Sequence, residues 1–132
     1  MTRYMLDTNM VSFAMRGRPA VLAAASKHGF EKCCVSAITE GELRYGLARN
    51  AGARNLPQLI DDFMLRFEVL PWTSLTARRY GLLRARFDAI GRRLAPLDML
   101  IAAHALEADA VLVTNDRAFG QVEGLMVEDW VG

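Results

Sequence analysis

Four carboxylates stand at positions where their side chains could act together on one ligand. Asp7 directly follows an apolar run, and Asp116 comes three residues after another. Asp98 follows a proline that suits the start of a helix, and Glu42 lies within two turns of a helix that Ser36 could cap. Carboxylates gathered in one place are the ligands that hard divalent cations such as Mg²⁺ and Mn²⁺ prefer.

Two apolar runs predict the strands that would position the first pair of acids. Residues 4–6 and 110–113 have the composition typical of strands buried on both faces of a parallel sheet. In open α/β sheets ligands bind at the carboxyl ends of the strands, and each connecting helix begins near that same edge. Helical side chains lean toward the helix N-terminus, so we expect Asp98 and Glu42 to reach this edge as well.

The convergence of four acids has an electrostatic consequence. Carboxylates within a few ångströms repel one another, and without a cation some would stay protonated at raised pKa values. A Mg²⁺ or Mn²⁺ ion would relieve this repulsion, whereas His28 and His104 stand too far apart in the sequence to suggest a zinc cluster. A cation that keeps some of its waters suits hydrolysis of phosphodiesters. The four acids therefore predict a metal-dependent phosphodiester hydrolase.

These acids also have other interpretations. Asp7 alone could simply cap the following helix, because Asp is a favoured N-cap residue. The same acids could serve a metal-dependent phosphatase or a DNA nuclease, since carboxylates and Mg²⁺ do not select a substrate. They could instead form a catalytically silent binding module that docks the arginines of a partner. Four acids on one edge favour the hydrolase over the docking module.

The elements between the acids alternate strands with helices. Further strands are predicted at 33–35, 68–70 and about 125–127. Helices are predicted over 10–14, 19–25, 37–49, 56–67, 74–90 and 97–108. Thr73 or Ser74 would cap the longest helix and Gly91 would end it. This alternation predicts a single α/β domain over residues 1–132, with a mostly parallel central sheet and helices on both faces.

Composition and charge limit the classes of function. The net charge of +1 excludes a strongly basic protein, so a nucleic-acid site would have to be a local patch. No apolar run approaches the ~20 residues of a membrane-spanning helix, and Asp7 interrupts the first run, so we expect neither membrane anchor nor signal peptide. Cys33 and Cys34 are neighbours on a predicted strand and would point to opposite faces, which disfavours a disulfide. These features are typical of a cytoplasmic protein.

One candidate for a basic patch lies on the predicted helix 74–90. Arg84 and Arg86 belong to an arginine-rich stretch in which Asp88 is the only acid between residues 78 and 93. They are candidates for contacts with RNA phosphates. The alternative is a solvated face opposite the apolar face of the helix, and the sequence leaves both open.

The acidic segments resemble those of a known family in order and spacing across essentially the whole chain. The segments are Leu6-Asp7-Thr8-Asn9, Thr39 through Leu43, Pro96 through Ala105, and Val113-Thr114-Asn115-Asp116. They are similar to the motifs of PIN-domain ribonucleases, above all the VapC toxins of toxin–antitoxin systems. By this resemblance Asp7, Glu42 and Asp98 match the acids that hold the metal. Asp116 matches a more variable fourth acid, and the residues that match the polar positions shaping the pocket are Thr8, Asn9 and Thr114.

The resemblance also implies an activity and partners. It implies an endoribonuclease with a single PIN-like domain that uses Mg²⁺ or Mn²⁺. It further implies a homodimer and a small antitoxin whose tail occupies the acidic groove. Some enzymes of this branch cut tRNA in the anticodon region. We therefore expect RNA as the substrate, with the tRNA anticodon region as a candidate target.

Overall fold

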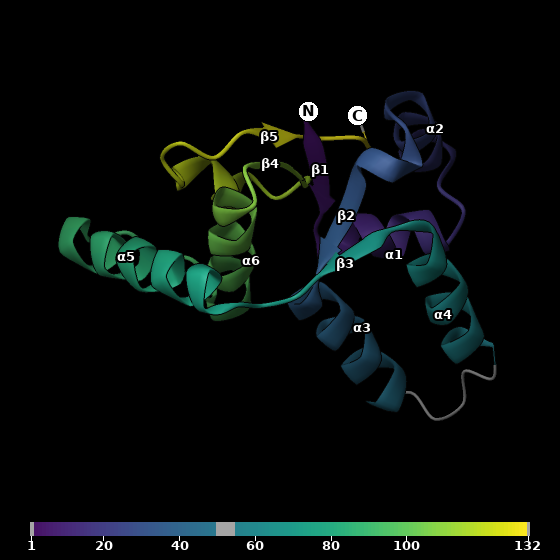
Figure 1. Ribbon diagram of the computed structural model, residues 1–132, viewed down its shortest axis with the longest axis horizontal. Helices are drawn as coiled ribbons and strands as arrows, with labels where there is room; N and C mark the ends of the chain where they lie inside the picture. Colours follow the sequence, from purple (N-terminus) through teal and green to yellow (C-terminus); the bar gives the residue numbers. More distant parts are fainter. Residues whose placement is uncertain (1, 50–54, 132) are drawn as a thin grey trace.

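A computed structural model describes residues 2–49 and 55–131 of the chain. Its elements alternate much as the sequence predicts (Figure 1). The strands are β1 (Arg3–Leu6), β2 (Cys33–Ser36), β3 (Glu68–Leu70), β4 (Ala110–Val113) and β5 (Val127–Glu128). The helices are α1 (Thr8–Met15), α2 (Pro19–His28), α3 (Ala37–Arg49), α4 (Leu56–Arg66), α5 (Ser74–Ile90) and α6 (Pro96–Glu107), with 3₁₀ turns η1 (Phe30–Lys32) and η2 (Arg117–Gln121).

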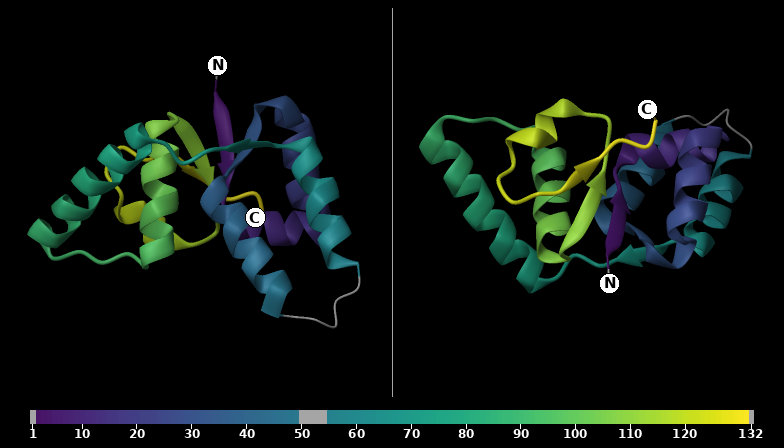
Figure 2. Two further views of the ribbon diagram at one scale, coloured as in Figure 1. Left: turned by 60° about the horizontal axis from the view of Figure 1, so that its bottom comes forward. Right: turned by 90° about the horizontal axis from the view of Figure 1, so that it is seen from above.

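The five strands of the described chain form one sheet in the order β3-β2-β1-β4-β5. Every pairing in it is parallel, which confirms the predicted parallel sheet. β1 lies at the centre, where Met5 pairs with Cys34 of β2 and Leu6 pairs with Val113 of β4. All strands therefore end at the same edge, and α3 and α6 begin there (Figures 1 and 2).

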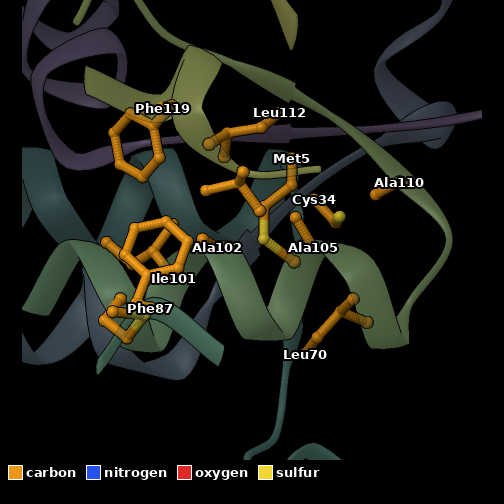
Figure 3. Close-up of a cluster of buried hydrophobic side chains, with 12 residues drawn as sticks. Met5, Cys34, Leu70, Phe87, Ile101, Ala102, Ala105, Ala110, Leu112 and Phe119 are labelled. Carbon is orange, nitrogen blue, oxygen red and sulfur yellow. The ribbon is translucent and has the colours of Figure 1, made fainter. Parts of the chain in front are cut away.

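The two faces of the sheet bury separate apolar clusters, because successive side chains of a strand point to opposite faces. Met5, Cys34 and Leu112 pack against α6 and the apolar side of α5 (Figure 3). Leu6 and Val113 point the other way and pack against α1, α2 and α4. The helices thus cover both faces, as the run of apolar residues in β1 predicts.

Several boundaries differ from the sequence prediction. α2 continues three residues beyond Ala25 to His28, where basic side chains favour the C-terminal end of the helix dipole, and Gly29 with φ of 105° ends it. The last strand lies at Val127–Glu128 because the pairing with β4 begins only after the turn at Gly124. The turns η1 and η2 were not predicted, since 3₁₀ segments this short carry no apolar periodicity.

The hairpin of α5 and α6 forms the outer part of one layer (Figure 2). Thr73 caps α5, because its hydroxyl accepts the backbone N–H of Thr76 and the Thr76 hydroxyl accepts the N–H of Thr73 in return. The Thr76 hydroxyl also donates to Glu107 at the end of α6 (3.1 Å). Gly91 ends α5 with φ of 71°, a conformation that favours glycine.

Buried polar groups and thiols fill specific places in the core. His104 is 2% exposed and shares a hydrogen bond of 2.7 Å with the Ser36 hydroxyl, which also accepts the N–H of Ile38 at the start of α3. Cys33 and Cys34 are buried free thiols on opposite faces, as predicted. Burial raises their pKa values to about 11 and about 12, respectively. No helix in the described residues is both long and apolar enough to cross a membrane.

The capping arrangement of α5 predicts a stability effect. Thr73→Ala removes the side-chain acceptor and should lower the free energy of unfolding by about 1 kcal/mol, as measured by urea denaturation. Ser74→Ala is the matched control, because Ser74 is the first helical residue and lacks the cap interaction. An equal or larger loss for Ser74→Ala would contradict the assignment of Thr73 as the cap.

Candidate active site

Asp7 lies where β1 leaves the sheet. The pairing of Leu6 with Val113 continues through a hydrogen bond from the Asp7 N–H to the Val113 carbonyl (3.0 Å). The Asp7 carboxylate is 5% exposed and caps α1 by accepting the N–H of Met10 (2.9 Å). Asp7 is therefore both the helix cap and a buried acid at the strand edge, so the two interpretations are compatible.

Glu42 reaches the same edge from α3. Its Oε1 accepts a hydrogen bond of 2.6 Å from the hydroxyl of Thr8, the first residue of α1. This contact joins segments 34 residues apart and places the carboxylate beside the end of β1. Thr39, one turn earlier in α3, is fully buried, and within the described chain its hydroxyl has no hydrogen-bond partner.

Asp98 and Asp116 come from the other side of β1. Asp98 is half-buried in the first turn of α6, near the positive end of the helix dipole. Asp116 follows β4, is exposed, and caps η2 by accepting the N–H of Ala118 (2.9 Å). Thr114, the first residue after β4, is buried, and its hydroxyl accepts the N–H of Asp116 (3.0 Å).

The pKa values show that these four carboxylates influence one another. Burial raises the pKa of Asp7, and the charges of Asp98 and Asp116 add to this, while hydrogen bonds from Thr114 and the Met10 N–H oppose it. Burial also raises the pKa of Asp98, and the charges of Asp116 and Glu42 raise it further. The structure thus gathers the four predicted acids into one electrostatic cluster, hereafter the acidic cluster.

The side chains of the acidic cluster are of the type that a hard cation prefers, but their spacing does not yet suit one. Its ligands are carboxylate oxygens, the type that Mg²⁺ and Mn²⁺ prefer, and a cation would relieve the repulsion that raises two of the pKa values. However, no three acidic, histidine or cysteine side chains in the described residues stand close enough together to hold an ion as they are. Glu42 accepts a hydrogen bond from Thr8 and Asp7 accepts one at the start of α1, and binding of an ion would require the four carboxylates to move closer together.

The remaining predicted residues divide into two groups. Thr8 and Thr114 hydrogen-bond members of the acidic cluster, as described above. Asn9 lies exposed in the first turn of α1, and no hydrogen bond among the described residues connects its side chain to the acids. The capping role of Asp116 in η2 is a feature that sequence reasoning missed, although an Asp followed two residues later by a free N–H is a known turn signal.

Arg84 and Arg86 lie on different sides of α5, because residues two apart on a helix do not face the same way. The Arg84 guanidinium donates to the Tyr80 hydroxyl (2.9 Å), and Arg84 lines a groove beside the start of α6. Arg86 pairs with Glu123 (3.1 Å) and lines a separate groove next to η2. The structure therefore does not bring the two arginines together.

Comparisons with known proteins agree with this arrangement. The PIN domain family profile matches residues 4–125. The chain is 34% identical over 131 residues to the tRNA(fMet)-specific endonuclease VapC of Shigella flexneri, covering 98% of this chain and 99% of the relative. It is 34% identical over 132 residues to ribonuclease VapC2 of Haemophilus influenzae strain KW20, covering 99% and 100%. The DNA-bound VapBC of Salmonella typhimurium contains a chain with a TM-score of 0.91 and 32% identity, covering 98% and 99%.

These similarities extend over the whole fold and over the segments that carry the acids. The profile match includes β1 through η2, and with it Asp7, Glu42, Asp98 and Asp116. The fold is thus shared with these relatives over nearly its whole length. The chain belongs to the PIN domain family, and within it to the VapC ribonucleases.

Proposed function

We propose that this chain is the toxin of a toxin–antitoxin system, an endoribonuclease that hydrolyses RNA phosphodiester bonds with the help of Mg²⁺ or Mn²⁺. The observation that carries the proposal is the acidic cluster, which four separate segments of the chain build at the carboxyl edge of the sheet. A module that merely docks arginines would not require acids whose pKa values are raised by burial and by one another.

The residues of the cluster take different roles in this proposal. Asp7, Glu42 and Asp98 would hold the cation, and Asp116, which is exposed, would contact it directly or through water. A bound Mg²⁺ or Mn²⁺ supplies Lewis acidity and favours ionisation of water at neutral pH. The Thr8 hydroxyl orients Glu42, and Thr114 supports both Asp7 and the backbone of Asp116.

The substrate that we propose is RNA, with a tRNA cut in its anticodon region as the specific candidate. The relative from Shigella flexneri is named as a tRNA(fMet)-specific endonuclease, and other relatives are named as ribonucleases. A DNA nuclease or a phosphatase would need the same acids, so the acidic cluster alone does not distinguish these activities. Mapping the cut ends in total RNA identifies the target.

Asp98→Asn tests whether the acidic cluster is catalytic. Cleavage of total RNA should fall by orders of magnitude, because the carboxylate that helps hold the cation is lost. The free energy of unfolding should change by no more than about 1 kcal/mol, since losing the helix-dipole interaction is offset by removing a charge whose pKa is raised in the folded state. RNA cleavage and thermal melting are measured side by side, and toxicity is followed by growth after expression.

Asp62→Asn provides the matched control for this experiment. Asp62 is exposed on α4, accepts a hydrogen bond from Gln58, and is not among the charges that act on Asp7 or Asp98. This variant should cleave RNA and slow growth like the wild type. If Asp98→Asn cleaves as well as Asp62→Asn while both melt normally, Asp98 is only a first-turn helix residue and the assigned site is wrong.

Divalent metal should stabilise the folded protein, because a ligand that binds the native state shifts unfolding by mass action. Mn²⁺ or Mg²⁺ should raise the melting temperature of the wild type, and Asp7→Asn should weaken this response. Asn caps helices as well as Asp does, so the variant should keep the start of α1 intact. An equal metal response in both proteins would exclude Asp7 as a ligand.

The raised pKa values of Asp7 and Asp98 also predict a pH dependence. Protons and metal compete for these carboxylates, so the metal-induced rise in melting temperature should disappear on acidification at a pH above their usual value of 3.8. Without metal, the stability of the folded protein changes with pH in the opposite direction. The folded state keeps protons that the unfolded chain has lost, so its stability falls as the pH rises from about 4 through the raised pKa values. Melting curves over this range, with metal and with a chelator, check both signs.

We also propose that a small antitoxin inhibits the chain and that the chain forms a homodimer. VapBC complexes are among its structural neighbours, and the acidic cluster suits an arginine of an inhibitory tail. Leu75 and Leu82 are more than 60% exposed on one side of α5 and offer apolar surface that a dimer would bury.

Co-expression tests the antitoxin proposal. A cognate antitoxin, sought as a small open reading frame immediately upstream, should relieve growth arrest and abolish RNA cleavage when it is expressed together with this chain. Its own arginines should be needed for inhibition, which arginine-to-glutamine variants of the small protein would show. Light scattering of the purified chain alone reports whether it is a dimer. If growth stays arrested although the small protein is stably co-expressed, that protein is not the antitoxin of this chain.

A further inference from the structure

A groove of about 320 Å³ lies between α5 and the start of α6. Its wall includes Tyr80 and Arg84 of α5 together with Arg92 and Arg93 of the connecting loop. We name it the arginine groove after these three arginines. Figure 2 shows the loop returning from the far end of α5 to the first turn of α6.

The arginine groove reaches the first turn of α6, the turn that also carries one member of the acidic cluster. Pro96 and Met99 of α6 complete its lining, and they stand on either side of Asp98 in the sequence. Asp98 is itself in the first turn of α6 and interacts with Asp116 and Glu42. The groove and Asp98 therefore both involve the first turn of α6, but Asp98 lies on a different side of the helix from Pro96 and Met99, so a ligand that contacts both has to pass around the start of α6.

Two of the three arginines of the groove are held in place by neutral acceptors. Arg84 donates to the Tyr80 hydroxyl (2.9 Å), and Arg92 donates to the backbone carbonyl of Gln121 (3.0 Å). The Gln121 side chain in turn donates to the Arg93 carbonyl, which fixes the loop. Within residues 2–49 and 55–131, no carboxylate lies within ion-pair distance of these three guanidinium groups. Their charge is thus available to a ligand.

The opposite side of α5 shows the contrasting case. Arg86 is already paired with Glu123, so its charge is largely neutralised within the molecule. Asp88 lines the arginine groove but forms no such pair with the groove arginines in the described chain. The lining of the groove, with three arginines and Asp88, has a formal charge of +2, and unlike Arg86 none of these arginines forms an ion pair in the described chain.

Phosphodiesters are the ligand class that this chemistry favours. The guanidinium group offers several donors in a planar fork that matches phosphate oxygens. A polyanion that approaches the acidic cluster is repelled by it, and a positive groove that reaches the first turn of α6 compensates for this repulsion. We propose that the arginine groove binds a backbone phosphate of the RNA strand that flanks the phosphodiester cleaved at the acidic cluster. This inference rests on the proposed ribonuclease function and adds a substrate-positioning surface to it.

The test measures RNA binding in an Asp98→Asn background, which prevents cleavage. The probe is a short fluorescein-labelled oligouridylate, whose affinity is followed by anisotropy over a series of KCl concentrations. Arg84→Gln/Arg93→Gln removes two groove charges, and Arg92 is kept because it also holds the loop. The matched control is Arg78→Gln/Arg79→Gln, which removes the same charge from exposed positions of α5 outside the groove.

The proposal predicts a difference in salt dependence between the two double variants. The slope of log affinity against log salt should become shallower by about 0.7 in the groove variant, because one phosphate contact to a single strand is lost. The control variant should keep the wild-type slope. Equal slopes in both variants, with both melting like the parent protein, would overturn the proposal.

Two further arms separate this inference from its alternatives. With Asp98 intact, the groove variant should raise KM for RNA cleavage more than it lowers kcat. If the wild type cleaves no RNA at all, the proposed function fails, whereas cleavage by the groove variant with unchanged KM overturns the groove alone. Arg84→Lys/Arg93→Gln keeps the charge at position 84 and should recover part of the RNA binding that Arg84→Gln/Arg93→Gln loses. Labelled oligoglutamate tests an acidic protein segment as occupant, and loss of its binding with unchanged RNA binding would also overturn the proposal.

Discussion

The burial of β1 on both faces is the constraint on which the rest of the molecule depends. Met5 and Leu6 are fully buried against opposite layers, so the second half of the strand has no room for a charge. The first carboxylate can stand only where the strand leaves the sheet, and that residue is Asp7. Parallel pairing with β4 then brings Thr114 alongside it. The acidic edge is thus a consequence of the two-layered core, and hydrogen bonds from Thr114 and the Met10 N–H offset part of the cost of burying Asp7.

Sequence patterns predict those elements whose signal is local. The strand Ala110–Val113 and the helix from Ala37 to Arg49 have the predicted bounds, because apolar composition and a capping serine mark them. The last strand was placed two residues too early, since its position depends on pairing with β4 and on the turn at Gly124, which composition does not encode. The 3₁₀ turns likewise depend on the packing around them, since they are too short to show an apolar periodicity.

The candidate site shows a similar division. That the four acids converge could be predicted, because parallel strands end and helices begin at one edge. Their individual hydrogen bonds could not, since the contact of Glu42 with Thr8 depends on how α3 packs beside α1. That Arg84 and Arg86 lie on different sides of α5 could be predicted from the sequence, because residues two positions apart on a helix do not face the same way. Asp7 shows that a helix cap and a functional acid can be the same residue.

The adjacent thiols of Cys33 and Cys34 have a consequence for how unfolding of this protein can be observed. Each thiol is buried, has a raised pKa and faces a different helical layer, so neither reacts with a thiol reagent until its own layer opens. Loss of the α5–α6 layer alone would expose Cys34, and loss of the α1–α2–α4 layer alone would expose Cys33. Molecules in which the thiol reagent has modified one cysteine would therefore indicate opening of one layer, and molecules modified at both cysteines would indicate cooperative unfolding. The chain thus contains its own pair of probes, one for each side of the sheet.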